Sequence, residues 1–387
     1  MSKSVRYKLN KSKGKRNKRK KVGKSKKVVK VPFKKFLKFL FLLAIGCILG
    51  FWFFVAYRTV TEIKVKDVIE SDSEIVKFAE DGKVRKTLLI YEDPNSVEEK
   101  NLFILAIIFN SDTSEVLIYY YPRNIYIHDY FAEKYISIEN LTYAGNSYMY
   151  EEKYAYVIRQ IEEQMSVKFN SYIWFGSEAG RNFVSDNERW GYSEEDVFEL
   201  FSKLSFFNLI TKYYKVYLFE EFLHSNMNFV EMYTYFQSIK GIVNAGNYKF
   251  VNLGEKSMTQ DVILGSGKNV RSLNMNAVDN SLRENIDILR ARDLSREHVK
   301  VEVYNGTDIP GYARIMARKI FNAGCRVIRY ENSSQNYEQN YIYIPDKEKF
   351  PNGLEVVNSI VEDATIVVGR PDFLTTGDIV VVLGQKE

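Results

Sequence analysis

The chain has 387 residues, of which 45% are hydrophobic and 15% aromatic, and this length and composition predict two folded domains with substantial cores. Two cysteines far apart in the sequence and three scattered histidines exclude a disulfide-rich scaffold and a zinc site built from cysteines. The formal net charge of +6 averages two unlike parts, because residues 1–38 hold 18 of the 55 Lys and Arg residues and no acid, whereas 37 basic and 49 acidic residues follow.

Residues 1–38 form a basic tail, which includes the stretch KSKGKRNKRKKVGKSKK and has too few apolar residues for a core. Such a composition predicts a disordered segment. Each Lys or Arg near an anionic membrane surface contributes on the order of 1 kcal/mol of binding free energy, so membrane lipid is the expected partner of the tail. A solvated tail that only sets membrane topology is the simpler alternative. Nucleic-acid binding by a regulator is not favoured.

Residues 39–57, FLFLLAIGCILGFWFFVAY, contain no charged side chain and predict a transmembrane helix. At about 1.5 Å per residue this segment spans roughly 30 Å, the thickness of the hydrocarbon core of a bilayer. Because the positive charges precede it, the positive-inside rule predicts a single-pass protein of the cytoplasmic membrane, with its N-terminus in the cytoplasm and everything after Arg58 outside. A cleaved signal peptide is disfavoured, since its charged region would be unusually long and no A-x-A-like site follows.

Residues 70–285 predict a mixed α/β domain with a central sheet. The expected elements are, in chain order, strands at 87–91, 102–109 and 115–121 with a hairpin turn at 110–114, a helix at 151–165, a strand in VKFNSYIWFG, helical structure over 193–240, and strands at 248–253 and 261–264. The segment LGSGKNV, residues 264–270, lacks the first glycine of a P-loop and is expected to be a tight turn.

Residues 286–298 predict a charged linker or short helix, and residues 299–384 predict a smaller α/β domain. Here VKVEVYNGT, CRVIRYE, QNYIYIP, ATIVVG and DIVVVLG are predicted strands, and IPGYARIMARKIFNAG and PNGLEVVNSIVE are predicted helices. This alternation indicates βαβ units and a partly parallel sheet. Gly306 is expected to adopt a positive φ in an Asn-Gly turn, and Gly324 is expected to cap the first of these helices.

The C-terminal region resembles the LytR C-terminal domain. The resemblance rests on V-x-V-x-N-G-T-x-x-P-G-x-A at Val301–Ala313, on G-C-x-V after the first helix, and on D-I-V-V-V-L-G at Asp378–Gly384. It covers nearly all of residues 299–384. This domain often follows a LytR-CpsA-Psr (LCP) domain in envelope proteins of bacteria that have a cell wall.

The middle region resembles the LCP domain, which implies an α-β-α fold with a central mixed sheet. In that family a strand ending in Ser-x-Pro-Arg-Asp supplies an arginine to a polyprenyl-pyrophosphate-linked glycan, and the counterpart here is Tyr-Tyr-Pro-Arg-Asn, with Arg123 and Asn124. ENLTYAG, which contains Asn140, resembles the Asn-rich loop of the family. FNSYIWF resembles its strand after the first helix, and SNMNFVEMYTYF resembles a late helix start, with Asn226 as the expected N-cap.

The sequence departs from the family pattern where the chemistry needs charge. Asn101 or Leu102 stands where the family has an acid that holds a magnesium ion, and Asp93 is the candidate metal ligand if Mg²⁺ is the cofactor. The family also has an R-x-R motif and a later Arg-Gln pair, for which only Arg181 and Arg189 are present, at a different spacing.

The resemblance implies one ligand-binding set, which comprises Arg123, Asn124, Asn140, Arg181 and Arg189, with Arg123 as the candidate catalytic residue. Phosphoryl transfer needs several positive groups, so a binding or scaffolding protein of the cell envelope with a degenerate catalytic site, a pseudoenzyme, is favoured. The alternative is an active phosphotransferase that ligates polyprenyl-pyrophosphate-linked glycopolymers to the cell wall. A polyprenyl-phosphate-linked glycan or peptidoglycan is the expected partner. Arg123 as an ordinary ion-pair residue at a strand end is the alternative to anion binding.

Overall fold

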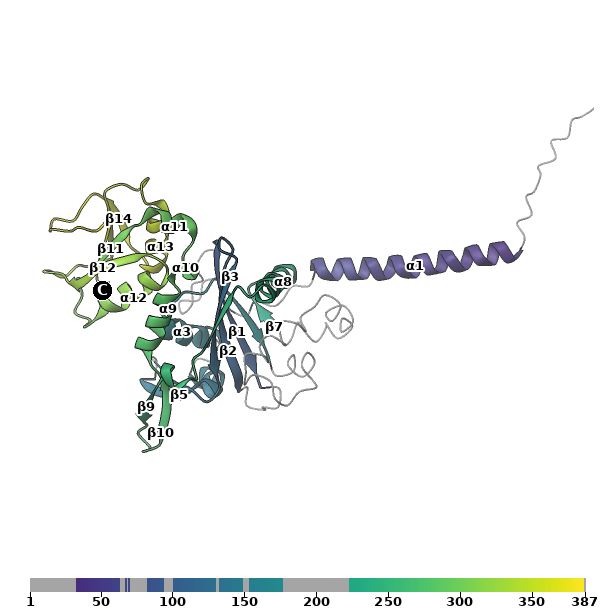
Figure 1. Cartoon of the computed structure of the whole chain (residues 1–387), viewed down its shortest axis with the longest axis horizontal. Coiled ribbons are helices and arrows are strands. Elements are labelled where there is room, and N and C mark those ends of the chain that lie inside the picture. The colour runs from purple at the N-terminus through teal and green to yellow at the C-terminus, as the bar shows by residue number, and fades with distance from the viewer. Residues whose placement is uncertain are drawn as a thin grey trace, which may run out of the picture. The chain divides into compact units, whose positions relative to one another are not determined.

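The computed structural model of the chain describes residues 33–62, 67, 69, 82–93, 100–129, 132–148, 153–176 and 223–385 (Figure 1). Most of the basic tail, residues 1–32, lies outside these ranges. The chain divides into two compact units, Met1–Tyr57 and Arg58–Glu387. Strands and helices alternate through the second unit, which confirms the predicted α/β class.

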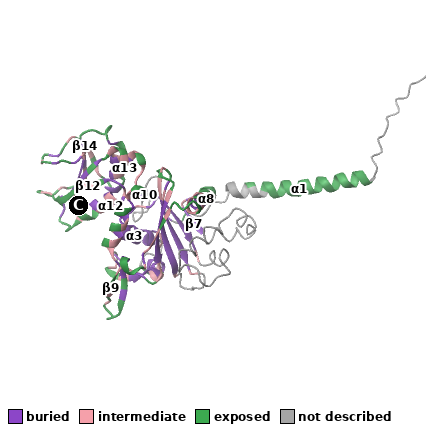
Figure 2. Ribbon diagram, in the orientation of Figure 1, coloured by how far each residue is buried: buried purple, intermediate pink, exposed green. Residues whose placement is uncertain are grey.

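Helix α1, Phe33–Glu62, contains the whole segment that is predicted to span a membrane. Its part Lys34–Phe54 is long and apolar enough to cross a bilayer. Large apolar side chains are exposed along it, for example Phe41 at 67% and Phe53 at 78% (Figure 2). A helix that is apolar on every side and not covered by protein is suited to a lipid environment.

The larger sheet of the second unit has six strands in the order β7-β6-β1-β2-β3-β8. These strands are β1 (Val84–Glu92), β2 (Asn101–Asn110), β3 (Glu115–Pro122), β6 (Ser171–Phe175), β7 (Leu223–Ser225) and β8 (Tyr248–Asn252). Strand β2 runs antiparallel to both β1 and β3, whereas β6 lies parallel to β1 and β8 lies parallel to β3. The sheet is therefore mixed, as predicted.

The hairpin between β2 and β3 has the predicted turn. Asn110 pairs with Glu115, so the chain reverses over the four residues between them. The side-chain oxygen of Asn110 accepts a hydrogen bond from the backbone N–H of Asp112 at 2.9 Å, and Ser114 adopts a φ of 54°. An Asn side chain that bonds to the backbone two residues on is a common device for closing a turn.

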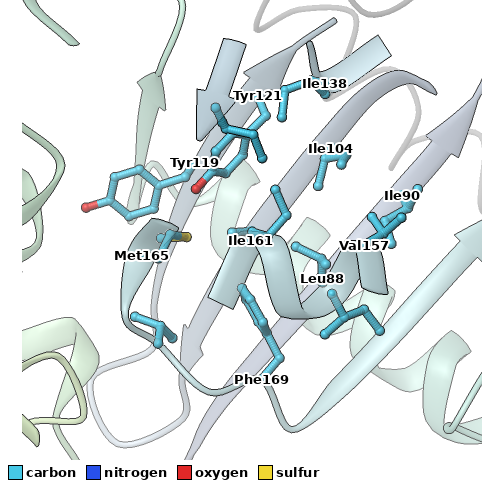
Figure 3. Close-up of a cluster of buried hydrophobic side chains, with 14 of the residues drawn as sticks. Leu88, Ile90, Ile104, Tyr119, Tyr121, Ile138, Val157, Ile161, Met165 and Phe169 are labelled. Atoms are coloured by element: carbon cyan, nitrogen blue, oxygen red, sulfur yellow. The ribbon is translucent and has the colours of Figure 1, made fainter. Parts of the chain in front are cut away.

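Both faces of the larger sheet are buried. Side chains alternate between the two faces along each strand, and each face has its own cluster of buried apolar residues. One face packs against helix α3 (Lys153–Met165). Figure 3 shows side chains of the sheet, including Leu88 and Ile104, gathered with Val157 and Ile161 of this helix. The two helix residues are four positions apart and therefore lie on the same side of α3.

The opposite face packs against helix α8 (Phe229–Asn244) through Met232, Phe236 and Ile239, which meet strand residues such as Leu105. Together the two faces give the predicted α-β-α layering. Helices α2 (Leu141–Tyr148) and α9 (Met275–Glu284) add residues to the core on the α3 side.

A smaller sheet has four strands in the order β5-β4-β10-β9. They are β4 (Tyr126–Asp129), β5 (Lys134–Ser137), β9 (Thr259–Ile263) and β10 (Asn269–Leu273). Of these strands the sequence predicts only β9, and β4, β5 and β10 are missed. The predicted tight turn joins β9 to β10, with Gly267 at a φ of +80°.

The C-terminal part has a five-stranded, partly parallel sheet in the order β12-β11-β15-β13-β14, as the alternation of elements predicts. Its strands are β11 (Lys300–Asn305), β12 (Arg326–Asn332), β13 (Tyr341–Ile344), β14 (Thr365–Val368) and β15 (Ile379–Leu383). Helices α12 (Tyr312–Asn322) and α13 (Pro351–Ile360) contribute to the core on one face. The predicted linker contains two short helices, α10 (Ile286–Leu289) and α11 (Arg292–Glu297), whose apolar side chains Ile288, Leu289 and Leu294 are buried.

Two predictions about residues 193–240 are wrong. Residues 177–222 lie outside the described ranges, but β7 is a strand within the stretch predicted to be helical, and it pairs with β6. The N-cap of α8 is Asn228, which forms a capping box with Glu231, and not Asn226. The Asn226 amide instead bonds to the start of β6, accepting from the N–H of Tyr172 and donating to the carbonyl of Asn170.

Three further local predictions are wrong. ENLTYAG is not a loop, since a 3-10 turn at Ile138–Asn140 leads directly into α2. Gly306 has no positive φ; a glycine is needed there because a Cβ would lie 2.7 Å from the carbonyl oxygen of Leu383. The C-cap of α12 is Ala323, and Gly324 follows it with a φ of +108°.

Candidate anion-binding site at the end of the larger sheet

Three strand termini meet at one end of the larger sheet: the end of β1, the start of β2 and the end of β3. In this register Tyr91 pairs with Phe103, which pairs in turn with Pro122. Strand β2 lies between the other two strands. The residues that follow β1 and β3, Asp93 and Arg123, therefore leave the sheet on either side of β2 and at the same end.

Asp93 and Arg123 form an ion pair, with 3.6 Å between Arg123 Nη1 and Asp93 Oδ2. Their side chains are 23% and 38% exposed. The backbone holds both in place, because the N–H of Asp93 donates to the carbonyl of Lys100 and the N–H of Glu139 donates to the carbonyl of Arg123. A partly exposed pair of this kind stabilises a protein by at most about 1 kcal/mol, so an anionic ligand can compete for the arginine.

Asn101 is fully buried at the start of β2, opposite Glu92. Its Nδ2 donates to the carbonyl of Ile138 at 2.9 Å, and its Oδ1 accepts from the hydroxyl of Thr142 at 2.7 Å. Both ends of the amide are thus used to attach β2 to the segment around α2. An aspartate could not donate to the Ile138 carbonyl, so the neutral amide suits this position for a structural reason.

Glu92 is a site residue that the sequence does not single out. It is 5% exposed, and its Oε1 accepts a hydrogen bond from the indole Nε1 of Trp174 on β6 at 2.8 Å. Its place directly after the apolar run LLIY marks it as the last residue of a buried strand, and that is the signal that could identify it. This hydrogen bond links the Glu92 carboxylate on β1 to Trp174 on the neighbouring strand β6.

The other predicted ligand-binding residues are only partly assembled. Asn124 is exposed beside Arg123, and Asn140 is half-buried with its Nδ2 donating to Ser137 Oγ at 3.0 Å. Arg181 and Arg189 lie outside the described residues. The described part of the chain therefore brings together one arginine, one aspartate and two amides at this end of the sheet.

Beneath the pair the core is closely packed. Tyr121, Ile125 and Ile138 are each at most 1% exposed and belong to the cluster that covers the α3 face of the sheet (Figure 3). Within the described part of the chain, the hydroxyl of Tyr121 is buried without a hydrogen-bond partner, and burial raises the pKa of this phenol far above its usual range. A buried polar atom without a partner is costly, so this hydroxyl is an unfavourable feature of the packed core.

The donor set at this end of the sheet does not fit a magnesium ion held by the protein. Asp93 lies against Arg123, Glu92 accepts from an indole, and Asn101 has both ends of its amide bonded. Over the described ranges no group of three or more His, Cys, Asp or Glu residues could hold a metal ion. Magnesium needs hard oxygen ligands in near-octahedral order. Among the described residues at this sheet end, the carboxylates are Asp93, paired with Arg123, Glu92, which is buried, and Glu139, which is half-buried.

This arrangement can bind an anion through the guanidinium of Arg123. The planar fork of arginine donates two parallel N–H groups to phosphate oxygens, and amide donors such as that of Asn124 can add to it. One cation can orient a phosphate group. Charge that builds up on a transferring phosphoryl group needs several positive groups.

Residues 298–386 match the family model described as LytR cell envelope-related transcriptional attenuator. These residues form a LytR C-terminal domain, which confirms the resemblance predicted for this region. A search of curated proteins found no match to the chain.

Several solved structures are similar to the chain. The protein gbs0355 from Streptococcus agalactiae is 10% identical over 54% of this chain and 89% of its own, with a TM-score of 0.38. TagU from Bacillus subtilis is 9% identical over 55% and 99%, with a TM-score of 0.39. The LytR-CPS2A-psr family protein YwtF (TagT), solved with bound octaprenyl pyrophosphate lipid, is 12% identical over 58% and 99%, with a TM-score of 0.38. Similarities at this level decide neither the ligand nor the activity of this chain.

Proposed function

We propose that this chain is a membrane-anchored cell-envelope protein of the LCP type that binds a polyprenyl-pyrophosphate-linked glycan and does not transfer it. In this proposal residues 1–38 are cytoplasmic, residues 39–57 cross the membrane, and an LCP-like domain (70–285), a linker (286–298) and the LytR C-terminal domain (299–384) lie outside the cell. The apolar helix α1, the match over residues 298–386 and the strand-end motif support it.

The observation that carries the proposal is the contrast between Arg123 and Asn101. Arg123 lies at the end of β3, partly exposed and within 3.6 Å of Asp93, where a phosphate group can reach it. Asn101, at the adjacent strand terminus, is a buried amide whose hydrogen bonds hold the fold together. The site therefore retains a group that recognises an anion, but the position beside it has a structural role instead of a second acid.

Binding would place the pyrophosphate against the guanidinium, with Asp93 displaced or hydrogen-bonded through water. Because the ion pair is worth at most about 1 kcal/mol, the cost of opening it is smaller than the gain from a charge-assisted, two-pronged contact of about 1.5–3 kcal/mol. Arg123 would thus contribute directly to affinity. A glycan or peptidoglycan strand attached to the pyrophosphate would extend from the sheet end.

The test is binding of geranylgeranyl pyrophosphate to the full chain in lipid nanodiscs, compared with Arg123→Met. Loss of a charge-assisted phosphate contact is expected to weaken binding by roughly tenfold or more. The matched control is Arg271→Met, which removes an exposed arginine of β10 that bonds only weakly to the carbonyl of Gly254 at 3.5 Å. Equal affinity of the wild type and Arg123→Met would remove Arg123 from the site and contradict the proposal.

The second candidate function is the active phosphotransferase. The observation that favours it is the carboxylate of Asp93, which is accessible and lies beside the arginine. The two functions differ in one measurable product, because transfer of a glycan phosphate releases polyprenyl monophosphate, whereas binding leaves the pyrophosphate intact. Release of monophosphate by the wild type but not by Asp93→Asn would establish the second candidate.

A further inference from the structure

A cavity of about 420 Å³ lies where the start of β1 and the end of α3 face helices α11, α12 and α13. This volume is within the range of small-molecule sites, roughly 300–1,000 Å³. None of the residues at the Arg123 end of the sheet lines it. The apolar part of its wall consists of Val84, Val167, Leu289, Ala291, Leu294, Ala323, Val356 and Ile360. We refer to it as the α3–α13 cavity.

Most of the charged side chains on the wall of this cavity are already neutralised by ion pairs. The pairs are Lys83 with Asp293, Lys168 with Glu162 at 3.4 Å, and Lys319 with Glu163 at 3.0 Å. Glu355 also lines the cavity, but it is exposed at its edge. A ligand inside the cavity would therefore meet little net charge from these residues.

Lys86 is the exception. It lies on β1, lines the cavity and is 8% exposed. No carboxylate lies within ion-pair distance of its ammonium group in the described ranges. Its backbone is held in place, because its N–H donates to the side chain of Asn170 at 2.7 Å and its carbonyl accepts from the N–H of the same residue at 2.8 Å. A buried ammonium group without a counter-ion is strongly destabilising.

The electrostatics of Lys86 are consistent with this isolation. Burial lowers the pKa of its ammonium group to about 8, and the only partner that opposes the effect is the thiol of Cys325. That thiol is 1% exposed, and burial raises its pKa to about 12, so it is neutral at physiological pH and is no counter-ion. Among the described residues, the wall therefore contains one cation, Lys86, with no carboxylate at ion-pair distance.

We infer that the α3–α13 cavity is a binding site for a small molecule that carries one carboxylate on an apolar body, with Lys86 as the residue that pairs with the carboxylate. The inference does not depend on the Arg123 site or on its ligand. The apolar wall accommodates the body of the ligand, and the single unpaired ammonium group selects a single negative charge. Binding would neutralise Lys86 and would leave the three existing ion pairs unchanged.

A carboxylate suits the site better than a phosphate monoester. A phosphate group carries about −1.5 to −2 charges at neutral pH, which exceeds the one positive charge available. The additional charge would face Glu162 and Glu163, which lie on the same wall. Repulsion from these carboxylates is expected to weaken phosphate binding.

The test is calorimetric titration of the full chain in lipid nanodiscs with 4-phenylbutyrate, with its neutral amide, and with phenyl phosphate. Saturable binding of the carboxylate is expected, with a dissociation constant below about 1 mM, and weaker binding of the other two probes. At pH 8, titrations in two buffers of different ionisation enthalpy should show uptake of about half a proton per carboxylate bound, because pairing raises the pKa of Lys86.

Lys86→Met keeps the length of the side chain and removes the charge, so the variant should fold and should weaken carboxylate binding at least tenfold, with no proton uptake. Lys268→Met is the matched control, since Lys268 is exposed in the turn between β9 and β10 and does not line the cavity. It should change the affinity by less than twofold. Undiminished binding by Lys86→Met, no saturable binding of 4-phenylbutyrate by the wild type, or tighter binding of phenyl phosphate would each overturn the inference.

Discussion

Strand β1 has a lysine near its start and an aspartate directly after its end. The two charged side chains differ in their exposure to solvent and in whether they are paired. At the far end Asp93 pairs with Arg123 in a partly exposed setting. At the near end Lys86 is buried on the wall of the α3–α13 cavity, and no carboxylate of the described residues pairs with it. Water screens and solvates the Asp93–Arg123 pair. The side chain of Lys86 is almost entirely removed from solvent, and no described residue provides a counter-ion for it.

This difference determines what each end can do. The exposed pair contributes little to stability, so Arg123 can exchange its partner for a ligand at little cost. The buried lysine destabilises the free protein. A bound partner that neutralises it removes this cost, and its binding is correspondingly stronger. The variants below test this contrast in order of expected effect on the free energy of unfolding.

The largest effect is expected from Asn101→Asp. The new carboxylate would be fully buried and would oppose the carbonyl of Ile138, to which Asn101 now donates. Leaving an uncompensated charge in the core should cost about 4 kcal/mol, measurable by denaturant unfolding. The control is Asn124→Asp, which adds the same charge at the same sheet end on an exposed residue and should change stability by less than about 0.5 kcal/mol.

If Asn101→Asp is instead as stable as the wild type, or is stabilised by added magnesium, the position accepts a metal-binding acid. The account of Asn101 as a structural amide would then be wrong.

Lys86→Met is expected to stabilise the protein at pH 7 by about 3 kcal/mol, since the pKa falls from 10.5 to about 8 and each pKa unit corresponds to about 1.36 kcal/mol. Between pH 8 and 10.5 the unfolded chain binds the proton more tightly than the folded chain, so the stability of the wild type rises with pH. The advantage of the variant should therefore be full below pH 8 and disappear by about pH 10.5. An advantage that is constant over this range would contradict burial of the charged amine.

The cavity that Lys86 lines is also lined by seven other charged residues: Lys83, Glu162, Glu163, Lys168, Asp293, Lys319 and Glu355. The thiol of Cys325 acts on Lys86 electrostatically. All of these groups are unchanged in the variant. Subtracting the pH profiles of the two proteins therefore isolates Lys86.

Arg318→Ala should destabilise the protein by about 2 kcal/mol, through loss of charge-assisted hydrogen bonds. Arg318 Nε donates to both oxygens of Asp279 at 2.6 and 2.8 Å, and its Nη atoms donate to the Gln164 carbonyl and the Ser166 hydroxyl at 2.7 Å each. These bonds join α12 to α9 and to the end of α3, where the cavity wall begins.

Arg314→Ala, on the same helix but exposed, is the control for Arg318→Ala and should be neutral within about 0.5 kcal/mol. If contact with α12 is what buries Lys86, the pKa of Lys86 should move toward 10.5 in Arg318→Ala. NMR titration of the lysine in both variants would show this, and an unchanged pKa would mean that Lys86 stays buried without the Arg318 contacts.

The smallest effect is expected from Asp93→Asn, Arg123→Met and the double variant. A double-mutant cycle on this pair should give a coupling free energy of at most about 1 kcal/mol, and addition of salt should reduce it. A coupling above about 2 kcal/mol would show that the pair is structural, and Arg123 would then not be available to a ligand.

The two ends of β1 also differ in how far the sequence predicts them. Arg123 is recognisable because Pro122 ends an apolar strand and a charged residue follows, so its position depends on neighbouring residues alone. Its pairing with Asp93 also needs the register between β1 and β2, which the sequence does not predict, because the predicted hairpin joins only β2 and β3. The motif therefore identifies Arg123, but not its ion-pair partner and not Glu92.

The burial of Lys86 could not be predicted in the same way. A lysine near the start of a strand resembles any solvated charge at a sheet edge, and what removes its water is the packing of residues 160–170 and 289–360 around it. The structural role of Asn101 is similar, since its partners Ile138 and Thr142 are about 40 residues away in a segment that the sequence predicts as a loop. Long-range contacts decide both cases.

The central claim, recognition of a pyrophosphate without transfer, is tested most directly by ³¹P NMR of a polyprenyl-pyrophosphate-linked disaccharide incubated with the full chain, magnesium and peptidoglycan. The two coupled phosphorus signals of the pyrophosphate should broaden on binding and remain intact, and Arg123→Met should abolish the broadening. The appearance of a polyprenyl monophosphate signal with the wild-type protein would contradict the account.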